Sequence, residues 1–225
     1  MASTATGLFG SSLVRKYWMA ATGLFLCLFL IGHLAGNLQL FIPGEEGQLQ
    51  FNAYAKFMTS NPAVKILSYL TYFSILLHAI DGIVLARQNK AARPVNYVKN
   101  SPEKNSSWAS RSMVLLGIIT LIFILIHMRS FWFEMHWGGL DTDANGNKDL
   151  YTITVAAFQT WWYTAFYVLA MIALAFHLSH GFSSAFQSMG WNHPKYMPVI
   201  KKIGVGFAVI IPLLFAAIPV YLFIK

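Results

Sequence analysis

Four histidines lie deep inside apolar segments of this 225-residue chain. They are His33, His78, His127 and His177, one in each of four successive segments. An ionisable side chain inside a membrane span is costly to bury and is by default a functional candidate. One such histidine could simply make a hydrogen bond between two helices. Four of them in successive segments favour a binding site instead.

Two of these histidines belong to an outer level. At a helical rise of about 1.5 Å per residue, His33 lies about 26 Å from Lys16, the charge that precedes its segment. By the same rise, His127 lies about 24 Å from Arg111. Both are therefore expected near the far side of the membrane, on two different helices.

The other two histidines belong to an inner level. His78 lies only about 14 Å from Arg87, and His177 about 15 Å from Gln187, where its helix is expected to end. This level also draws on two different helices. The depths therefore predict two pairs, one at each level.

A pair of histidines from facing helices is what a b-type haem requires, with one imidazole on each side of the porphyrin. Zinc would need a third or fourth ligand near each pair. Asp81, three residues from His78, leaves one weaker metal arrangement open. We therefore expect two haem b groups, held by His78 with His177 and by His33 with His127.

Glycines accompany these histidines. The segments His78–Gly82 and His177–Gly181 share the pattern H-x-x-x-G, which places both residues on one helix face. Gly32 and Gly36 are small neighbours of the first histidine. A glycine at such a position lets a flat macrocycle approach the backbone. The alternative is that these glycines only allow close helix packing.

The amino-acid composition is that of a membrane protein. Only 11% of residues are charged and 56% are hydrophobic, whereas soluble domains carry about 25% charged residues. The composition argues against an ordinary soluble enzyme and excludes a disordered chain. The single cysteine excludes a disulfide framework and the C-x-x-C-H type of haem attachment.

The uncharged stretches are long enough for transmembrane helices, which need about 20 apolar residues. We expect an all-α membrane protein, one domain over residues 1–225, with five transmembrane helices in a bundle. The fourth stretch is interpreted as one long helix, because turn residues follow it only at 188–194. The expected helices cover about 16–41, 64–87, 110–133, 153–187 and 199–224.

The basic residues are distributed unevenly between the two ends of such a bundle. Eleven of the 16 Lys and Arg lie on the side of the N-terminus with two acidic residues, so the net charges are +9 there and −1 opposite. The positive-inside rule then places the N-terminus in the cytoplasm. The net charge of +8 is explained this way without a nucleic-acid partner. The eleven are Arg15, Lys16, Arg87, Lys90, Arg93, Lys99, Lys104, Arg111, Lys195, Lys201 and Lys202.

Three segments carry a resemblance to a known family. Residues 11–26, 32–41 and 176–187 (FHLSHGFSSAFQ) resemble the cytochrome b membrane-anchor subunit of bacterial succinate dehydrogenases. The similar form is the single-chain, five-helix, two-haem type, which fumarate reductases share. The resemblance covers all five helices, whereas the loops match poorly, above all the acidic stretch 141–149.

The resemblance implies a role and a location. The subunit would anchor a flavoprotein and an iron–sulfur protein at the cytoplasmic face of the bacterial cytoplasmic membrane, among its lipids. Electrons from succinate, a tricarboxylic acid cycle substrate, would pass through the haems to quinone, expected to be menaquinone. The chain itself would hold no succinate chemistry. In this family the ligand precedes a glycine by four positions, which selects His177 over His180.

The quinone site has two candidate positions. At the outer end, Glu45, Glu46 or Gln48 could accept a quinol proton, or they could belong to a solvated loop. At the inner end, Ser11 and Arg15 are similar to a serine–arginine pair that binds quinone in related two-chain enzymes. A helix-initiating serine and an interfacial arginine are common for other reasons.

Haem propionates would require basic partners, because arginine forms bidentate pairs with carboxylates. The alternative is that these side chains only extend to the membrane interface. His180 is a further candidate for a propionate contact. The arginine candidates are Arg15, Arg87, Arg111 and Arg129.

Two other functions stay open at this point. A cytochrome b subunit of a hydrogenase or formate dehydrogenase would keep the haems and change the partner. A transporter or proton channel with a histidine relay would bind no haem at all.

Overall fold

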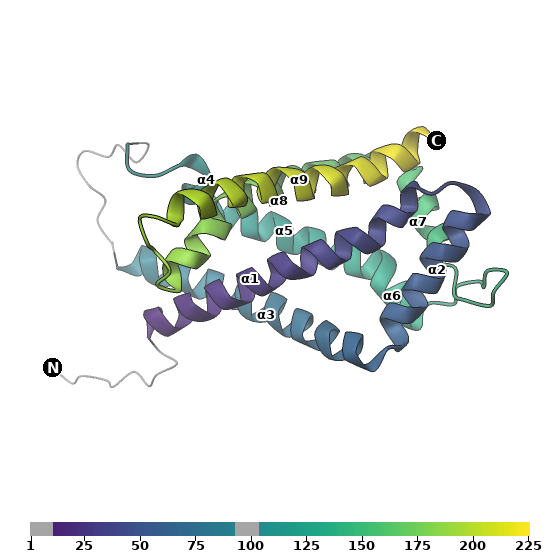
Figure 1. Cartoon of the computed structure of the whole chain (residues 1–225), viewed down its shortest axis with the longest axis horizontal. Coiled ribbons are helices and arrows are strands. Elements are labelled where there is room, and N and C mark those ends of the chain that lie inside the picture. Colours follow the sequence, from purple (N-terminus) through teal and green to yellow (C-terminus); the bar gives the residue numbers. More distant parts are fainter. Residues whose placement is uncertain (1–10, 93–103) are drawn as a thin grey trace.

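Five helical stretches are long and apolar enough to cross a membrane, which confirms the expected number. The computed structural model describes residues 11–92 and 104–225, so Arg93, Lys99 and Glu103 of the charge count lie outside the described residues. The described residues are mainly helical (Figure 1). The five stretches are Ser12–Phe41, Pro62–Ala91, Met113–Trp137, Trp161–Ser188 and Met197–Ile224.

Three spans are single helices and two contain a change of helix type. The single helices are α3 (Pro62–Ala91), α8 (Trp161–Ser188) and α9 (Met197–Ile224). The first span is α1 (Ser12–Asn37) continued by the 3₁₀ turn η2 (Leu38–Phe41). The third span follows the short α4 (Trp108–Arg111) and consists of α5 (Met113–His127), the π-helical segment η4 (Met128–Trp132) and α6 (Phe133–Trp137).

The outer surfaces of the spans are apolar. In the most apolar window of each span, only 6% to 33% of the residues are buried within the protein. A soluble monomer rarely exposes so much contiguous apolar surface. Lipid accommodates it, provided that every backbone group is satisfied within a helix. The chain therefore has the character of a multi-pass membrane protein.

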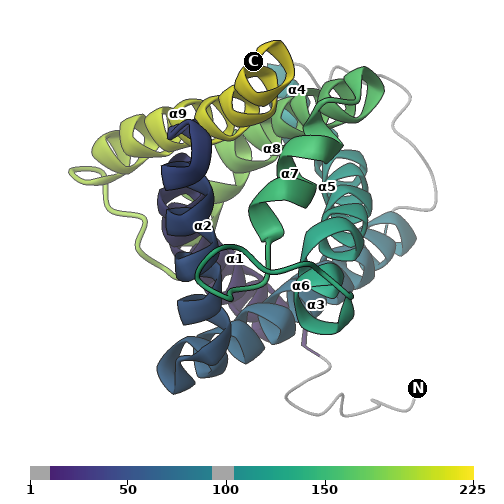
Figure 2. The same ribbon diagram turned by 90° about the vertical axis from the view of Figure 1, so that its right-hand side faces the viewer.

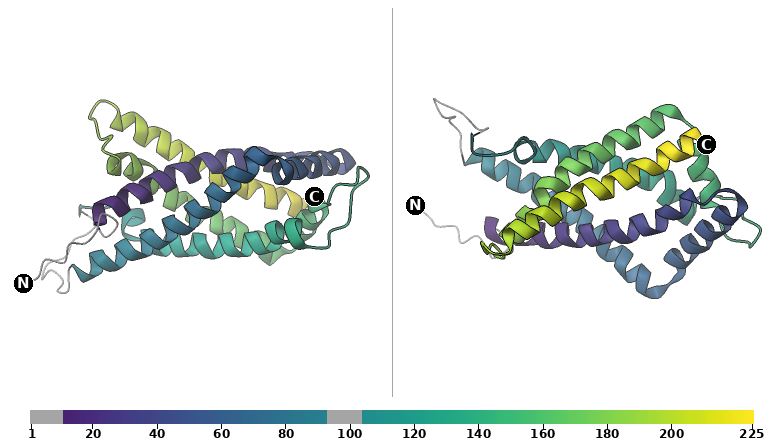
Figure 3. Two further views of the ribbon diagram at one scale, coloured as in Figure 1. Left: turned by 90° about the horizontal axis from the view of Figure 1, so that it is seen from below. Right: turned by 45° about the horizontal axis from the view of Figure 1, so that its top comes forward.

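Small residues allow the helices to approach closely. α8 packs mainly on α9, α1 packs on α3, and both α1 and α5 contact α8 (Figures 1 and 3). Ala170 and Ala208 are buried between the last two helices. A side chain at Gly204 would place its Cβ 2.8 Å from a ring carbon of Phe182. Such small-residue contacts are typical of helix packing in membranes.

A helix replaces the loop expected after the first span. α2 (Gly44–Ser60) lies across the end of the bundle that carries the C-terminus, beside α7 (Leu150–Phe158) (Figure 2). Asn52 on α2 is fully buried and donates to Asp149, the N-cap of α7. Its own oxygen accepts from the backbone N–H of Tyr151. These contacts, distant in sequence, explain why the segment is ordered as a helix.

The single helix expected at 153–187 is wrong, because the chain breaks between α7 and α8. Thr160 has extended dihedral angles, φ −88° and ψ 112°. Side chains satisfy the backbone around the break, since the Thr164 hydroxyl donates to the carbonyl of Phe158 at 2.7 Å. Gln159 donates to the carbonyl of Leu222 on α9 at 2.6 Å. No glycine or proline marks this site, so the sequence did not indicate it.

The loop expected after the fourth span is confirmed. α8 ends at Ser188, and Gly190 adopts a left-handed φ of +81°. A residue of this conformation directly after a helix is usually glycine, because other residues are strained there. The next backbone N–H, of Trp191, bonds back to the carbonyl of Phe186 and closes the helix.

Candidate functional site

The structure brings the four span histidines together in two pairs. The ring centroids of His33 on α1 and His127 on α5 are 5.7 Å apart. Those of His78 on α3 and His177 on α8 are 6.1 Å apart. These are the two pairs expected from depth, and each joins two different helices.

The spacing within each pair fits two ligands on opposite sides of one metal ion. Imidazole nitrogens lie about 2 Å from a metal that they bind, as in zinc sites. Two rings that coordinate one iron from opposite sides would then have centroids about 6 Å apart. The observed 5.7 and 6.1 Å match that value. The residues present therefore fit a group that takes two axial histidines.

The pairs lie at different heights in the bundle. A Cβ placed on Gly23 of α1 would lie 3.1 Å from Cε1 of His78. His33 follows Gly23 by ten residues in the same helix, which corresponds to about 15 Å. The His78–His177 pair is the one nearer the start of α1. This arrangement agrees with the expected inner and outer levels.

In the inner pair, hydrogen bonds fix the tautomer of His78. Its Nδ1 lies 3.2 Å from the carbonyl oxygen of Met19, which can only accept, so Nδ1 carries the proton. The hydroxyl of Thr22 lies 3.3 Å from the same atom but donates to the carbonyl of Trp18. Nε2 therefore bears the lone pair. A second-shell carbonyl of this kind typically orients a metal-binding histidine.

His177, the partner of His78, makes fewer hydrogen bonds. Nδ1 of His177 is buried and has no hydrogen-bond partner among the described residues. His180, the competing candidate, contacts the hydroxyl of Ser184 through Nε2 at 3.2 Å. The ring paired with His78 is thus that of His177. This selects the same residue as the H-x-x-x-G register.

Two glycines outside the H-x-x-x-G pattern face the inner pair. Besides Gly23, Gly117 of α5 faces it, since a Cβ there would lie 3.7 Å from Cε1 of His177. Around the glycines of that pattern, a Cβ on Gly82 would meet Met19 at 3.4 Å, and one on Gly181 would meet nothing within 4 Å. Helix packing across the chain brings in Gly23 and Gly117, and no local pattern marks them.

The glycines near the first histidine also have other surroundings. A Cβ on Gly36 would lie 2.3 Å from the ring of Tyr54 on α2, so this glycine allows α1 and α2 to pack. Around Gly32 there is nothing within 4 Å. The packing alternative is therefore correct for Gly36.

An ion pair lies beside the inner level. Nη1 of Arg15 is 2.7 Å from Oδ1 of Asp81, which is one helical turn beyond His78 and only 2% exposed. The Nε of Arg15 is buried without a partner among the described residues. Ser11 caps α1 by accepting from the backbone N–H of Leu13. Asp81 thus pairs with an arginine of α1, and no local pattern in the sequence marks this pair.

Aromatic rings enclose the outer pair. Phe29 and Phe215 lie against His33, with centroids 5.2 and 5.6 Å away. Phe123 and Phe131 lie against His127 at 5.7 and 5.5 Å. The rings in contact with these two histidines are thus mainly apolar and aromatic.

One buried hydroxyl breaks that apolar surround. The Oη of Tyr167 lies 3.2 Å from Nδ1 of His127. His33 has only a long contact of 3.5 Å between Nδ1 and the amide nitrogen of Asn37, which is too weak to fix its tautomer. For all four span histidines, Nε2 has no hydrogen-bond partner among the described residues. All four are therefore free to bind through the same atom.

The remaining predicted residues lie away from the histidine pairs or are already engaged. Arg87 is exposed near the end of α3, and Arg111 donates to the carbonyl of Ser106. Arg129 pairs with Glu134 and lies over the ring of Phe133.

The acidic candidates for the outer quinone site are also separate from the pairs. Glu45 and Glu46 are exposed in the first turn of α2. Gln48 donates to Asp149 at 2.6 Å and so helps to tie α2 to α7.

Hydrogen bonds lower the pKa of Asp149, the carboxylate that links α2 to α7. Burial raises the pKa of Asp149, but hydrogen bonds from Thr152, Asn52 and Gln48 outweigh it and hold the pKa below the usual 3.8. Asp149 is therefore ionised at neutral pH, and its charge is an integral part of the contact between α2 and α7.

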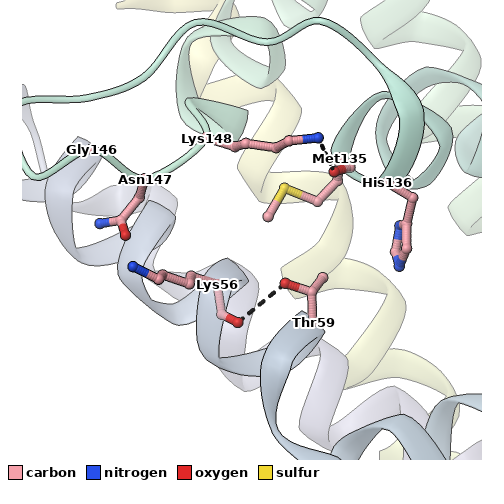
Figure 4. Close-up of a pocket in the computed structure, with 7 residues that line it drawn as sticks. All are labelled: Lys56, Thr59, Met135, His136, Gly146, Asn147 and Lys148. Atoms are coloured by element: carbon pink, nitrogen blue, oxygen red, sulfur yellow. Dashed lines mark hydrogen bonds between the residues drawn. The ribbon is translucent and has the colours of Figure 1, made fainter.

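A pocket of about 330 Å³ lies at the same end, between α2, the end of α6 and the loop that precedes α7 (Figure 4). Lys148 crosses it and donates to the carbonyl of Met135 at 2.9 Å. Neither a histidine of the two pairs nor a predicted quinone residue lines it. Its lining residues are Lys56, Thr59, Met135, His136, Gly146, Asn147 and Lys148.

Comparisons with protein-family models, with curated proteins and with solved structures found no match. Within the described residues, no group of three or more His, Cys, Asp or Glu could hold a metal ion. The described residues instead offer histidines in pairs, His33 with His127 and His78 with His177.

Proposed function

We propose that this chain is a dihaem cytochrome b membrane-anchor subunit of the succinate:quinone oxidoreductase type. The observation that carries the proposal is the presence of two histidine pairs at two levels, each joining two different helices. His78 and His177 would hold the inner haem, and His33 and His127 the outer one. When bound, haem supplies an iron that takes up and releases single electrons.

The residues around each pair have defined tasks in this proposal. The Met19 carbonyl keeps the Nδ1 proton on His78, which leaves Nε2 available for iron. The aromatic rings around His33 and His127 keep water away from the outer level. Arg15 would offer its free Nε to a propionate or to a quinone at the inner end.

The proposal includes an orientation and partners. The end with the N-terminus would face the bacterial cytoplasm, because the basic residues concentrate there. A flavoprotein and an iron–sulfur protein would bind at that face. Electrons would reach the inner level first and a membrane quinone, menaquinone by the resemblance, last.

The first test is the haem content of the purified chain. A pyridine haemochrome assay against protein mass is expected to give two haems b per 25.2 kDa chain. A histidine-relay transporter would instead give no haem absorption in a reduced-minus-oxidised spectrum. A ratio near zero or one would refute the two-haem proposal.

The second test identifies the partners. Mild solubilisation of native membranes should co-purify a subunit with covalently bound flavin and an iron–sulfur subunit. A hydrogenase or formate dehydrogenase partner in place of the flavoprotein would keep the haem assignment and reject the succinate assignment.

A further inference from the structure

A buried chain of hydroxyl groups leads away from the outer histidine pair. Tyr167 and Tyr163 lie one turn apart on α8, and their Oη atoms are 3.1 Å apart. The hydroxyl of Tyr163 donates to Oγ of Ser130, in η4, at 2.7 Å. Tyr167 and Tyr163 are only 6% and 8% exposed. The two tyrosines in the middle of the chain are therefore buried, whereas His127 and Ser130 at its ends are partly buried.

Counting hydrogens gives this chain a direction. A tyrosine hydroxyl has one hydrogen, and that of Tyr163 is used on Ser130. Tyr167 must then donate to Tyr163, so its oxygen is left to accept from His127. His127 consequently carries its proton on Nδ1 and its lone pair on Nε2.

We infer that Tyr167 is a positioning residue that holds His127 in its iron-binding tautomer and lowers the reduction potential of the outer haem. This inference rests on the proposed function. A hydrogen bond accepted from the far nitrogen of a ligating histidine makes that histidine a stronger electron donor. A stronger donor favours ferric over ferrous iron, so removal of the bond should raise the potential.

The effect should be confined to one level. At the inner level, His78 donates to the carbonyl of Met19, a backbone group that no substitution of a tyrosine removes. The inner and outer haems therefore have different partners for the same histidine atom. Replacement of Tyr167 should change one potential and leave the other unchanged.

The test is a redox titration of Tyr167→Phe, followed by optical spectroscopy of the intact complex. The aromatic ring is retained, and the Tyr163 hydroxyl can still donate to Ser130. The fold should therefore be kept. Tyr221→Phe is the matched control, because that hydroxyl donates to the carbonyl of Phe41 and touches no histidine. Tyr163→Phe removes the bonds to Tyr167 and Ser130 but leaves the contact between Tyr167 and His127, and should give a smaller shift of the same sign.

The expected result is two haems per chain in every variant, with one midpoint potential more positive in Tyr167→Phe and both unchanged in Tyr221→Phe. Loss of one haem from Tyr167→Phe alone would also support the inference, since the tautomer would no longer be held. Two retained haems with unchanged potentials would overturn it. A wild-type chain without haem would refute the proposed function itself, which the haem assay reveals before any titration. Introducing Tyr167→Phe into a His78→Ala background assigns the shifted step to the outer haem.

Discussion

The guanidinium of Arg15 and the carboxylate of Asp81 join α1 to α3 at an N–O distance of 2.7 Å, one turn from His78. Asp81 is almost fully buried, whereas 28% of the Arg15 side chain is exposed. The two partners are therefore not equivalent. Arg15 can reach water when it is alone, but Asp81 cannot.

Arg15→Ala should consequently destabilise the protein more than Asp81→Asn. Removal of one partner from a buried pair leaves an uncompensated charge, which costs about 3–5 kcal/mol. Asp81→Asn leaves no buried charge and should cost less. Thermal unfolding in detergent measures both. Lys16→Ala, at an exposed neighbouring position, is the control, and equal effects for Arg15→Ala and Lys16→Ala would contradict the prediction.

Each span histidine should control one haem. His78→Ala and His177→Ala should each lose the inner haem, and His33→Ala and His127→Ala the outer one. Low-temperature difference spectra report which absorption band disappears.

His180→Ala is the decisive comparison, because this residue also lies on α8 and its ring makes a hydrogen bond with Ser184. Both haems should remain in this variant. If it loses a haem while His177→Ala keeps two, the ligand assignment on α8 is wrong.

Gly23→Ala should disturb the inner haem. The added Cβ would lie 3.1 Å from the His78 ring, which is held by the Met19 carbonyl, so the ring must shift. A weakened or displaced inner absorption band is expected. Gly117→Ala should be tolerated, because its Cβ would lie at an ordinary contact distance of 3.7 Å from His177. Identical spectra for the two variants would show that Gly23 does not restrict the ring.

The stabilising contact of Asp149 between α2 and α7 should weaken only at acidic pH. The folded pKa of Asp149 is lower than its unfolded value, so its contribution to stability is complete above about pH 3.9. It is lost as the pH falls through the folded pKa. The difference in unfolding midpoint between wild type and Asp149→Asn should stay constant from pH 7 to pH 5 and shrink below pH 3.8. A difference that shrinks between pH 7 and pH 5 would reject this explanation, and Asp141→Asn, at an exposed position, is the control.

Spans and histidine pairs could be predicted from sequence for a common reason. The length and apolarity of a span are properties of one continuous segment, and the rise per residue of a helix is constant. Both can therefore be read from neighbouring residues. His33 and His127 were paired because each lies a similar distance from the charge that starts or ends its span. The same arithmetic paired His78 with His177.

Features that depend on contacts between distant segments could not be predicted. The break at Thr160 is stabilised partly by Gln159 reaching Leu222, 63 residues away. The helical state of α2 depends on Asn52 contacting the start of α7. In the sequence, Tyr167 does not differ from the other aromatic residues of the apolar spans. The fold places its hydroxyl beside His127. No local pattern distinguishes such residues from ordinary packing positions.

The π-helical turn directly after His127 has a consequence for the length of the third span. A π turn accommodates one residue more than an α turn at nearly the same height. Deletion of a single residue within Met128–Trp132 would therefore restore a regular helix without shortening the hydrophobic span appreciably. Because the extra residue is accommodated within a full turn, the residues that follow would keep nearly the same direction around the helix axis. The third span should therefore tolerate loss of one residue at this turn better than loss of one residue within the regular helix α5, where the residues that follow would rotate by about 100°.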